Sequence, residues 1–387
     1  MAGKTYYVSG TGNDKNDGSN QKAAFRTLQK AGDLVKAGDT VYVMNGTYTN
    51  PYANILSIDN KNGSANAPIT FKALSGHNPV LVTDKHNWNA ISITGSSYIN
   101  IEGLTLKGAR DKITLAYALK EKTNLNNPAT SGNGINITYS QEDSKKRSHH
   151  ITISDNKVSN FPGGGITAIE ADYITVKDNV VSGNAWYSPF GAQGISMLHL
   201  WNSDKNTKDY KIVIEDNTVF DNKQLVPYYA VGEITEGHGV MVDRAYIGSD
   251  SYKGKVLISD NLIYKNGGSG IQLFRADNPI DVLHNTTYKN SQVLTTGEIF
   301  INKANDVDVE NSIFVGKGGQ AINPISKSTG FSFEDNLVYN GSFKNTGSGS
   351  GNIIGKDPLF VNPASGNFDL QALSPAIIGG TTLGIID

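Results

Sequence analysis

The chain has 387 residues, and its 34 Lys and Arg against 36 Asp and Glu give a formal net charge of −2, which excludes a nucleic-acid binder that works by net charge. The absence of Cys excludes disulfides, thiolate metal sites and Cys nucleophiles. No segment reaches the roughly 18 consecutive apolar residues that a membrane-spanning helix needs.

The first predicted helix lies within residues 22–37. Four apolar residues of this segment have the spacing of one helix face: Phe25, Leu28, Ala31 and Val35. Such an amphipathic helix can cover the open end of a stacked structure. We therefore expect residues 1–50 to hold an N-terminal strand followed by a capping helix.

The main feature of the sequence is a repeat of the form Ile-x-Ile-x-Asp-Asn followed by x-Val/Ile-x-x-Asn. Its instances are ITISDNKVSN (151–160), YITVKDNVVSGN (173–184), IVIEDNTVFDN (212–222), VLISDNLIYKN (256–266), DVLHNTTYKN (281–290), VDVENSIFVG (307–316) and FSFEDNLVYN (331–340). A regular period of this length is typical of a solenoid. We expect the repeated Asn (Asn156, Asn179, Asn217, Asn261, Asn285, Asn311 and Asn336) to sit at turns and bond the backbone of the next coil.

A second short strand, usually led by glycine, precedes each repeat. These strands are GINIT (134–138), GGITAI (164–169), GISML (194–198), GVMVD (239–243), GIQLF (270–274) and EIFIN (298–302). Three strands and three turns per repeat predict an all-β, single-stranded parallel β-helix with an N-terminal helical cap and a core of Ile and Val. The expected single domain has its coils in 51–345 and a C-terminal capping tail in 346–387.

The start YYVSGTGNDKNDGS…FRTLQKAGDLVKAGDTVYVMNGTY (6–48), the coil pattern and the closing DPLF…SPAI resemble a known family. They are similar to bacterial right-handed parallel β-helix proteins of the pectate-lyase-like superfamily. The N-terminal block resembles those of secreted polysaccharide lyases that act on pectate and alginate. The resemblance implies this fold, a polysaccharide substrate, and a secreted or cell-surface location.

Insertions into the repeat indicate where a site could lie. Three fall before the glycine-led strands, at 109–132, 184–193 and 222–238, and others follow those strands at 139–148, 201–209 and 246–254. Loops on both sides of one exposed sheet predict a groove along coils 134–244 that suits an extended polymer, although long loops are also tolerated as surface decoration.

Aromatic residues in these loops are candidates for stacking on sugar rings at the groove rim. They are Trp186, Tyr187, Tyr228 and Trp201. Some of them could instead pack the loops against the coils.

Strand alternation predicts which side chains face the groove. Among outward positions of the looped coils, only Asp243 is charged, whereas Asn136 and Ser196 are polar. Polar residues just past the strand ends add candidate substrate contacts: Glu170, Asp172, His199, Arg244 and Arg275. Arg244, Arg275 and Lys303 form a line of cations on successive coils that could neutralise a uronate polymer or could be solvated turn residues.

The densest polar segment is 233–244, so we expect chemistry to centre on Asp243, with Arg244, Glu236, His238 and Tyr187 around it. Asp243 there could be an acid or base, a partner of His or Arg, or a metal ligand. The structural alternative is a strand-end Asp that bonds turn amides. A His between glycines, such as His238, could likewise be a turn residue.

Three functions remain open at this point. The first is β-elimination on a uronate polysaccharide, which needs a neutraliser for the carboxylate, a base for the C5 proton and an acid for the leaving oxygen. The candidate neutralisers are Arg244, His238 and Asn136, and the candidates for base or acid are Tyr187, His199 and His238. The second is glycoside hydrolysis by paired carboxyls, from Asp243 with Glu236 or from Glu170 with Asp172. The third is a non-catalytic glycan-binding surface protein.

The expected partner is a polysaccharide, with no nucleic acid and no membrane, and we expect a monomer. No motif predicts a metal site and no cofactor is required by the pattern. A Ca²⁺ ion held by turn acids, or by Asp243 and Glu236, is an open alternative.

Overall fold

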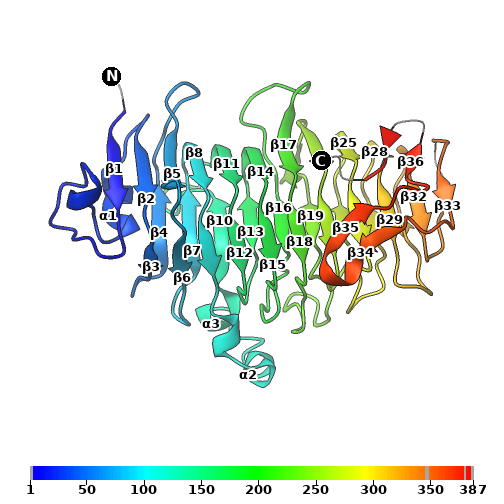
Figure 1. Ribbon diagram of the computed structural model, residues 1–387, viewed down its shortest axis with the longest axis horizontal. Helices are drawn as coiled ribbons and strands as arrows, with labels where there is room; N and C mark the ends of the chain where they lie inside the picture. Colours follow the sequence, from blue (N-terminus) through cyan, green and yellow to red (C-terminus); the bar gives the residue numbers. More distant parts are fainter. Residues whose placement is uncertain (1–2, 345–347, 379–380, 385–387) are drawn as a thin grey trace.

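The computed structural model of the protein describes residues 3–344, 348–378 and 381–384. The chain winds into an elongated stack of coils with β1 (Thr5–Val8) and α1 (Leu28–Leu34) at one end (Figure 1). Each complete coil gives one strand to each of three parallel sheets, which we name sheets A, B and C. The predicted right-handed parallel β-helix with three strands per coil is confirmed.

Sheet A contains β1, β2 (Thr40–Val43), β5 (Ile69–Ala73), β8 (Ser97–Glu102), β11 (His149–Ser154), β14 (Asp172–Lys177), β17 (Tyr210–Glu215), β22 (Lys255–Ser259), β25 (Ile280–Leu283), β28 (Val307–Glu310) and β31 (Phe331–Glu334). Sheet B contains β3 (Gly46–Tyr48), β6 (Pro79–Val82), β9 (Thr105–Lys107), β12 (Lys157–Ser159), β15 (Val180–Ser182), β18 (Thr218–Phe220), β23 (Leu262–Tyr264), β26 (Thr286–Tyr288), β29 (Ile313–Val315), β32 (Leu337–Tyr339) and β33 (Ile353–Ile354). Sheet C contains β4 (Asn54–Asp59), β7 (Asn89–Thr94), β10 (Asn133–Thr138), β13 (Ile166–Ile169), β16 (Ile195–Leu198), β19 (Val240–Asp243), β24 (Ile271–Phe274), β27 (Ile299–Asn302) and β30 (Ile325–Ser326).

The core is a narrow column of Ile, Val and Leu side chains. Strand alternation sends every second residue inward, and the parallel register places apolar residues of successive coils on top of one another. Along sheet C one such file is Ile135, Ile166, Ile195, Val240 and Ile271, each fully buried.

The N-terminal cap is a shorter helix than the spacing within 22–37 predicts. Residues Gln21–Ala23 form a 3₁₀ turn, and α1 begins after Thr27, whose hydroxyl accepts the Lys30 N–H. Phe25 stays outside the helix because its backbone bonds Tyr7 and Ser9 beside β1. Its buried ring nevertheless packs into the core with the apolar face of α1, so the expected capping role holds.

The repeated Asn side chains form a buried ladder between coils. Asn217, for example, accepts from Asn179 and donates to the Val176 carbonyl and to the Asn261 side chain. The prediction of Asn311 as a ladder member is wrong: Ser312 accepts the Asn285 N–H in its place.

Four of the Asn residues that end the repeats form a second ladder at the turn from sheet B to sheet C. Asn184, Asn222, Asn266 and Asn290 each accept from, or donate to, their counterparts on neighbouring coils. Glu298 ends this ladder by accepting from the Asn290 backbone and side chain. Burial raises the pKa of Glu298 to about 7.

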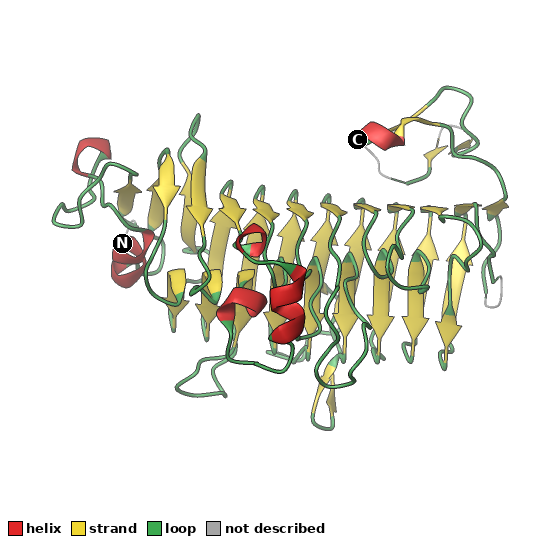
Figure 2. Cartoon of the chain, turned by 90° about the horizontal axis from the view of Figure 1, so that it is seen from below, coloured by secondary structure: helices red, strands yellow, loops and turns green. Residues whose placement is uncertain are grey.

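The predicted capping tail, 346–387, meets the far end of the stack with residues 348–354, where β33 pairs with β32 and Asn352 accepts the Asn336 N–H. Its hairpin, β34 (Phe360–Asn362) and β35 (Asn367–Leu370), lies outside the strands, against the outer face of sheet B (Figure 2). Phe368 packs against Tyr264 and Tyr288 at 5.1 and 5.2 Å between ring centroids.

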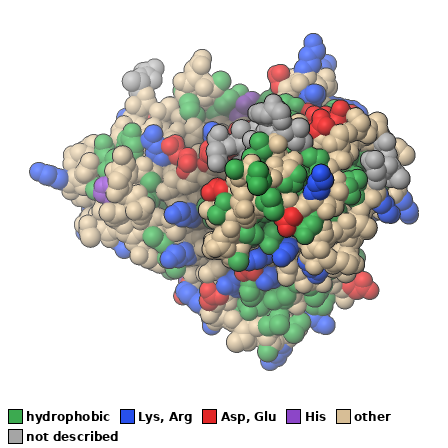
Figure 3. Space-filling view, turned by 45° about the vertical axis from the view of Figure 1, so that its right-hand side comes forward, with side chains coloured by type: hydrophobic (Ala, Val, Ile, Leu, Met, Phe, Trp, Pro, Cys, Tyr) green, Lys and Arg blue, Asp and Glu red, His purple; other side chains and the backbone are tan. Residues whose placement is uncertain are grey.

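The reason for this placement is that the late strands of sheet B carry apolar residues on their outer face, such as Ile313 and Leu337, which need a cover. Figure 3 brings this end of the molecule forward and shows apolar side chains exposed among charged ones. Val361 and Leu373 of the C-terminal segment are exposed. A last short β-hairpin pairs β36 (Ile377–Ile378) with β37 (Thr381–Thr382).

The predicted insertions are seen as loops beside sheet C. Residues 109–132 hold the 3₁₀ turn Arg110–Lys112 and the short helices α2 (Leu115–Lys120) and α3 (Pro128–Ser131), which project from the stack (Figure 1). On the other flank, β20 (Tyr246–Ile247) and β21 (Asp250–Ser251) form a small antiparallel hairpin. Within the described residues, every helix is too short or too polar to cross a membrane.

We predict that Asn217→Ala lowers the free energy of unfolding by about 3 kcal/mol, because several buried ladder groups lose their partners at once. The side chain is 1% exposed. Denaturant-induced unfolding followed by circular dichroism measures the change. Asn126→Ala, at an exposed loop position, is the matched control; equal stabilities of the two variants would contradict the ladder's role.

Candidate functional site

The outer face of sheet C presents two rows of side chains in strict register. The inner row passes through Asn136, Thr167, Ser196, Met241 and Gln272. Ser196 and Met241 are only 8% and 2% exposed, so the loops nearly cover this row. The second row, near the strand ends, stays partly open, and it is there that Asp243 lies.

A row of cationic side chains follows the strand ends of sheet C. Its members are Arg244, Arg275, Lys303 and Lys327, and His199 holds the same position one coil before them; φ lies between 48° and 54° at all five residues. This left-handed conformation is uncommon for residues other than glycine. Each backbone N–H from His199 to Lys303 donates to a carbonyl of the next coil. Neighbouring members of the row are therefore one strand apart, at about 4.8 Å.

Asp243 is the last residue of β19, and its carboxyl is largely buried. Burial raises the pKa of Asp243 to about 6, while Arg244, His199 and Arg275 act in the opposite direction. Asp243 Oδ1 is buried without a hydrogen-bond partner, and so is Arg244 Nε, 3.8 Å away. Unpartnered buried polar atoms are rare in folded proteins, which makes these two atoms candidates for ligand contact.

Glu236 supplies a second buried carboxyl to the same site. Burial raises the pKa of Glu236 to about 7, and the charge of Asp243 adds to this rise. Gln193 Nε2 donates to Glu236 Oε2 at 2.6 Å. Gln224 Oε1 accepts the backbone N–H of Thr235 and Glu236, so the carboxyl is held in one position.

His238 takes part in hydrogen bonds between coils and is not an exposed acid or base. Its Nδ1 accepts the Ser269 N–H at 2.8 Å, and its own N–H donates to Gln193 Oε1, as one coil bonds the next. The ring is fully buried, and burial lowers the pKa of His238 to about 3. Nε2 therefore carries the proton and lies 3.8 Å from Glu236 Oε2. The predicted role of His238 as neutraliser or base is not supported.

His199 has the geometry that His238 lacks. Its Nδ1 lies 3.1 Å from the Tyr246 carbonyl oxygen, which can only accept. In the neutral ring Nε2 is therefore the unprotonated nitrogen, and no hydrogen bond to it is seen among the described residues. Of the two roles predicted for His199, substrate contact and base or acid, its position beside Asp243 suits a proton acceptor.

The predicted aromatic residues divide between site and packing. Burial raises the pKa of Tyr228, and the charges of Arg244, Glu236 and Asp243 also influence this pKa. Tyr228 therefore lies within electrostatic range of the two carboxyls of Asp243 and Glu236, which we call the carboxyl pair.

Trp186, in contrast, is engaged by the protein. Arg110 lies 4.1 Å and Lys223 5.1 Å from its ring centroid, and its indole N–H donates to the Asp221 carbonyl. Tyr187 contacts Trp186 edge-on, and within the described part of the chain no contact joins it to Asp243 or Glu236. These observations argue against the predicted stacking role of Trp186 and the catalytic role of Tyr187.

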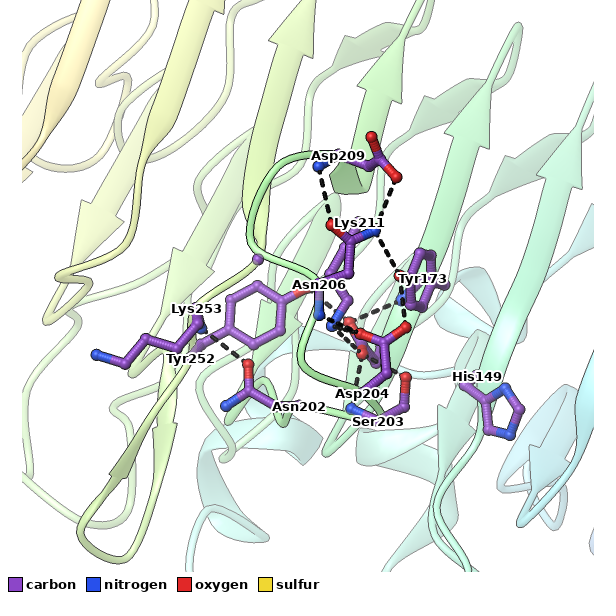
Figure 4. A network of polar contacts seen from close by, with 12 residues as sticks. His149, Tyr173, Asn202, Ser203, Asp204, Asn206, Asp209, Lys211, Tyr252 and Lys253 are labelled. Carbon is purple, nitrogen blue, oxygen red and sulfur yellow. Dashed lines mark hydrogen bonds and ion pairs between the residues drawn. The ribbon is translucent and has the colours of Figure 1, made fainter.

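The predicted pair of Glu170 and Asp172 does not form a second carboxyl site. Glu170 is ion-paired with Arg147 at 2.9 Å. Asp172 is fully buried on sheet A, where Lys211 Nζ lies 2.7 Å from it and the hydroxyls of Ser203 and Tyr252 donate to it. Figure 4 shows Lys211, Ser203 and Tyr252. The prediction of Asp172 as a groove residue is wrong, because its carboxyl anchors the loops that follow β16 and β19.

Sequence reasoning did not identify Gln193, Gln224 and Tyr246. Gln193 directly precedes a strand-leading glycine, as His238 and Ser269 do. Polar residues at this recurring position form hydrogen bonds between coils. The position before the strand-leading glycine could therefore have identified Gln193 as a bonding residue. Tyr246 acts through its backbone carbonyl, which leaves no mark in the sequence.

The open alternative of a Ca²⁺ ion finds little support in the donor set. Within 3–344, 348–378 and 381–384, no three His, Asp or Glu side chains converge in a metal-binding arrangement. Asp243 and Glu236 supply two carboxyls, fewer oxygen ligands than Ca²⁺ takes. No chemical step is therefore assigned to calcium.

We predict that Asp243→Asn raises the Tm at about pH 8 and leaves it unchanged at about pH 4. The folded-state pKa of about 6 exceeds the ordinary value of 3.8, so the protonated form is favoured in the fold. The stability that protonated Asp243 gives the fold is complete below the unfolded-state pKa and is lost as the pH rises through about 6. Asn stays neutral at every pH, so the variant does not suffer this loss. Differential scanning calorimetry measures both values.

Asp308→Asn, an exposed strand Asp on sheet A, is the control and should show no such pH-dependent gain. If Asp243→Asn lowers the Tm at both pH values, the carboxylate makes structural bonds and the interpretation fails.

Known proteins similar to this chain share its fold. A pectate lyase Pel9A structure aligns over 100% of this chain and 94% of its own, with 18% identity and a TM-score of 0.54. An alginate lyase from Paenibacillus sp. str. FPU-7 aligns over 91% and 99%, with 14% identity and a TM-score of 0.51. A protein described as a glycoside hydrolase aligns over 91% and 96%, with 9% identity and a TM-score of 0.52. At these identities the likeness concerns the fold.

One curated relative is the uncharacterized protein YwoF of Bacillus subtilis (strain 168), 31% identical over 159 residues. The match covers 41% of this chain and 29% of YwoF. The family model described as "Pel9A-like, right handed beta helix region" matches residues 6–306, which is most of the chain. The chain therefore belongs to the Pel9A-like right-handed β-helix family.

Proposed function

We propose that this protein is a carbohydrate-active enzyme that cleaves an acidic, uronate-containing polysaccharide along sheet C. The observation that carries the proposal is the cationic row from Arg244 to Lys327, one side chain per coil, beside His199 and the buried carboxyls of Asp243 and Glu236. A regular row of cations matches a regular row of substrate carboxylates. Secretion or display at the cell surface is part of this proposal, because such polymers lie outside the cell.

The chemistry that this arrangement fits best is β-elimination. Arg244 and Arg275 pair with the carboxylate of the sugar and thereby acidify its C5 proton. His199 Nε2 accepts that proton, the bond between C4 and the glycosidic oxygen breaks, and a C4=C5 double bond forms. The Nδ1 bond to the Tyr246 carbonyl orients the ring, and Asp243 stabilises the imidazolium that results.

The departing oxygen needs a proton, and Glu236 is the candidate donor. With a pKa of about 7, a large fraction of Glu236 is protonated at neutral pH, unlike an ordinary carboxyl. Tyr228, which lies within electrostatic range of Glu236, is the alternative donor.

Hydrolysis is the second candidate, and one observation favours it. The two carboxyls interact and have raised pKa values of about 7 and about 6, which is the environment that separates a general acid from a base or nucleophile. In that reaction Glu236 would protonate the leaving oxygen and Asp243 would act on water or on the sugar.

One experiment separates the candidates. The protein is incubated with pectate, alginate and neutral glycans, and the ultraviolet absorbance of the new double bond is recorded together with reducing ends. Elimination raises both signals, hydrolysis raises reducing ends alone, and neither signal rises for a binding protein. Cleavage of neutral glycans alone would overturn the proposed acidic substrate.

We predict that Asp243→Asn lowers kcat at least about 100-fold, the low end of what a positioned acid or base contributes. His199→Gln should lower kcat by a similar factor if elimination is the reaction, because glutamine cannot accept the C5 proton. Both variants should retain the circular dichroism spectrum of the wild type. Near-normal turnover by folded Asp243→Asn would place the chemistry elsewhere.

We also predict that Arg275→Gln and Lys303→Gln raise KM for the polymer several-fold and weaken its dependence on salt, since each removes one charge of the row. Initial rates at low and high ionic strength measure both effects. Lys157→Gln, an exposed position on sheet B, is the control. An equal effect of all three substitutions would show that only net charge matters.

A further inference from the structure

A hollow lies beyond the strand ends of sheet C, on the flank opposite the loop 222–238, which carries Glu236. Its volume is about 500 Å³, and it is bounded by Arg147, Trp201, Asn202, the turn of the β20–β21 hairpin and Lys253. These residues come from the loops that follow β10, β16 and β19. We name this hollow the rim pocket.

The rim pocket contains an aromatic ring with an unused donor. Trp201 Nε1 is buried and has no hydrogen-bond partner. The Arg147 guanidinium lies 5.5 Å from the Trp201 ring centroid and is held there by its ion pair with Glu170. A flat apolar ring, an unpaired N–H and a fixed cation are together what a pyranose with a carboxylate group requires.

The walls of the rim pocket are fixed before any ligand arrives. Asn202 accepts the Lys253 N–H and donates to the Ser251 carbonyl, which joins the two loops (Figure 4). The neighbouring residues Ser203 and Tyr252 both donate to the buried Asp172. A preformed wall lowers the ordering cost of binding.

The same hairpin connects the rim pocket to the proposed base. Tyr246, in β20, accepts the His199 Nδ1 proton through its backbone carbonyl, and its ring meets the His199 ring edge-on at 6.2 Å. Ile247 and Asp250 of this hairpin line the rim pocket. A ligand there would therefore contact the element that orients His199.

We propose that the rim pocket is a saccharide subsite for an acidic sugar of the polymer, remote from the bond that is cleaved. The pyranose packs on the Trp201 ring, and Arg147 and Lys253 pair with the carboxylate. This inference rests on the proposed function for its substrate class. It adds a place where longer chains gain affinity that short chains lack.

Binding is tested without turnover, in the Asp243→Asn background. Tryptophan fluorescence is recorded while hexasaccharides and disaccharides of galacturonate and of alginate are added, and the same titration is made with Trp201→Phe added. The expected result is a fluorescence change with a hexasaccharide that Trp201→Phe abolishes. Trp88→Phe, which removes a tryptophan from another part of the chain, should leave the change intact.

Kinetics give the second test. Trp201→Ala and Arg147→Gln should raise KM for the polymer about tenfold, equivalent to about 1.4 kcal/mol, while kcat and the KM of short oligosaccharides stay within a factor of two. Lys205→Gln, an exposed position on the same loop, should change neither constant.

The outcomes separate this inference from the proposed function. If the wild type cleaves acidic polymers but Trp201→Ala and Arg147→Gln leave KM unchanged, the rim pocket is no subsite and the function stands. If Trp201 fluorescence responds to a hexasaccharide but no polymer is cleaved, the subsite stands and the function fails. If Trp201→Ala lowers the Tm strongly, Trp201→Phe and Arg147→Gln decide the matter.

Discussion

Buried hydrogen bonds between equivalent side chains of successive coils fix the register on which every other feature of this protein depends. In a strand, a shift of one residue would exchange the two faces, sending Asp243 into the core and Val242 to the outer face of sheet C. The Asn ladders resist such a shift, because each buried amide bonds the coils before and after it. Where Ser312 replaces Asn, it keeps the same inter-coil bond and thus the register.

The cationic row is a consequence of this register. Because His199, Arg244 and Arg275 share one backbone conformation at one position of the coil, their side chains point the same way. Cations spaced about one strand apart repel one another, and a bound polyanion relieves that repulsion. The repetition of the solenoid therefore produces the regular spacing of charge on which the proposed acidic substrate rests.

The carboxyl pair depends on departures from repetition. Glu236 comes from an insertion and Asp243 from a strand, and they meet only because Gln193 and Gln224 tie the insertion to the coils. The same loops exclude water, which raises both pKa values toward neutrality. On the other flank, Asp172 anchors the loops that form the rim pocket.

The sequence by itself determined the β-helix, its three strands per coil and the outward direction of Asp243, because these follow from periodicity and alternation, which are local properties. Only the tertiary structure decided which polar residues belong to the site. His238 and Asp172 bond across coils and become structural, whereas His199 keeps a free nitrogen because a backbone carbonyl 47 residues away holds the other. Burial and long-range partners set these roles, and neither is visible in the spacing of residues along the chain.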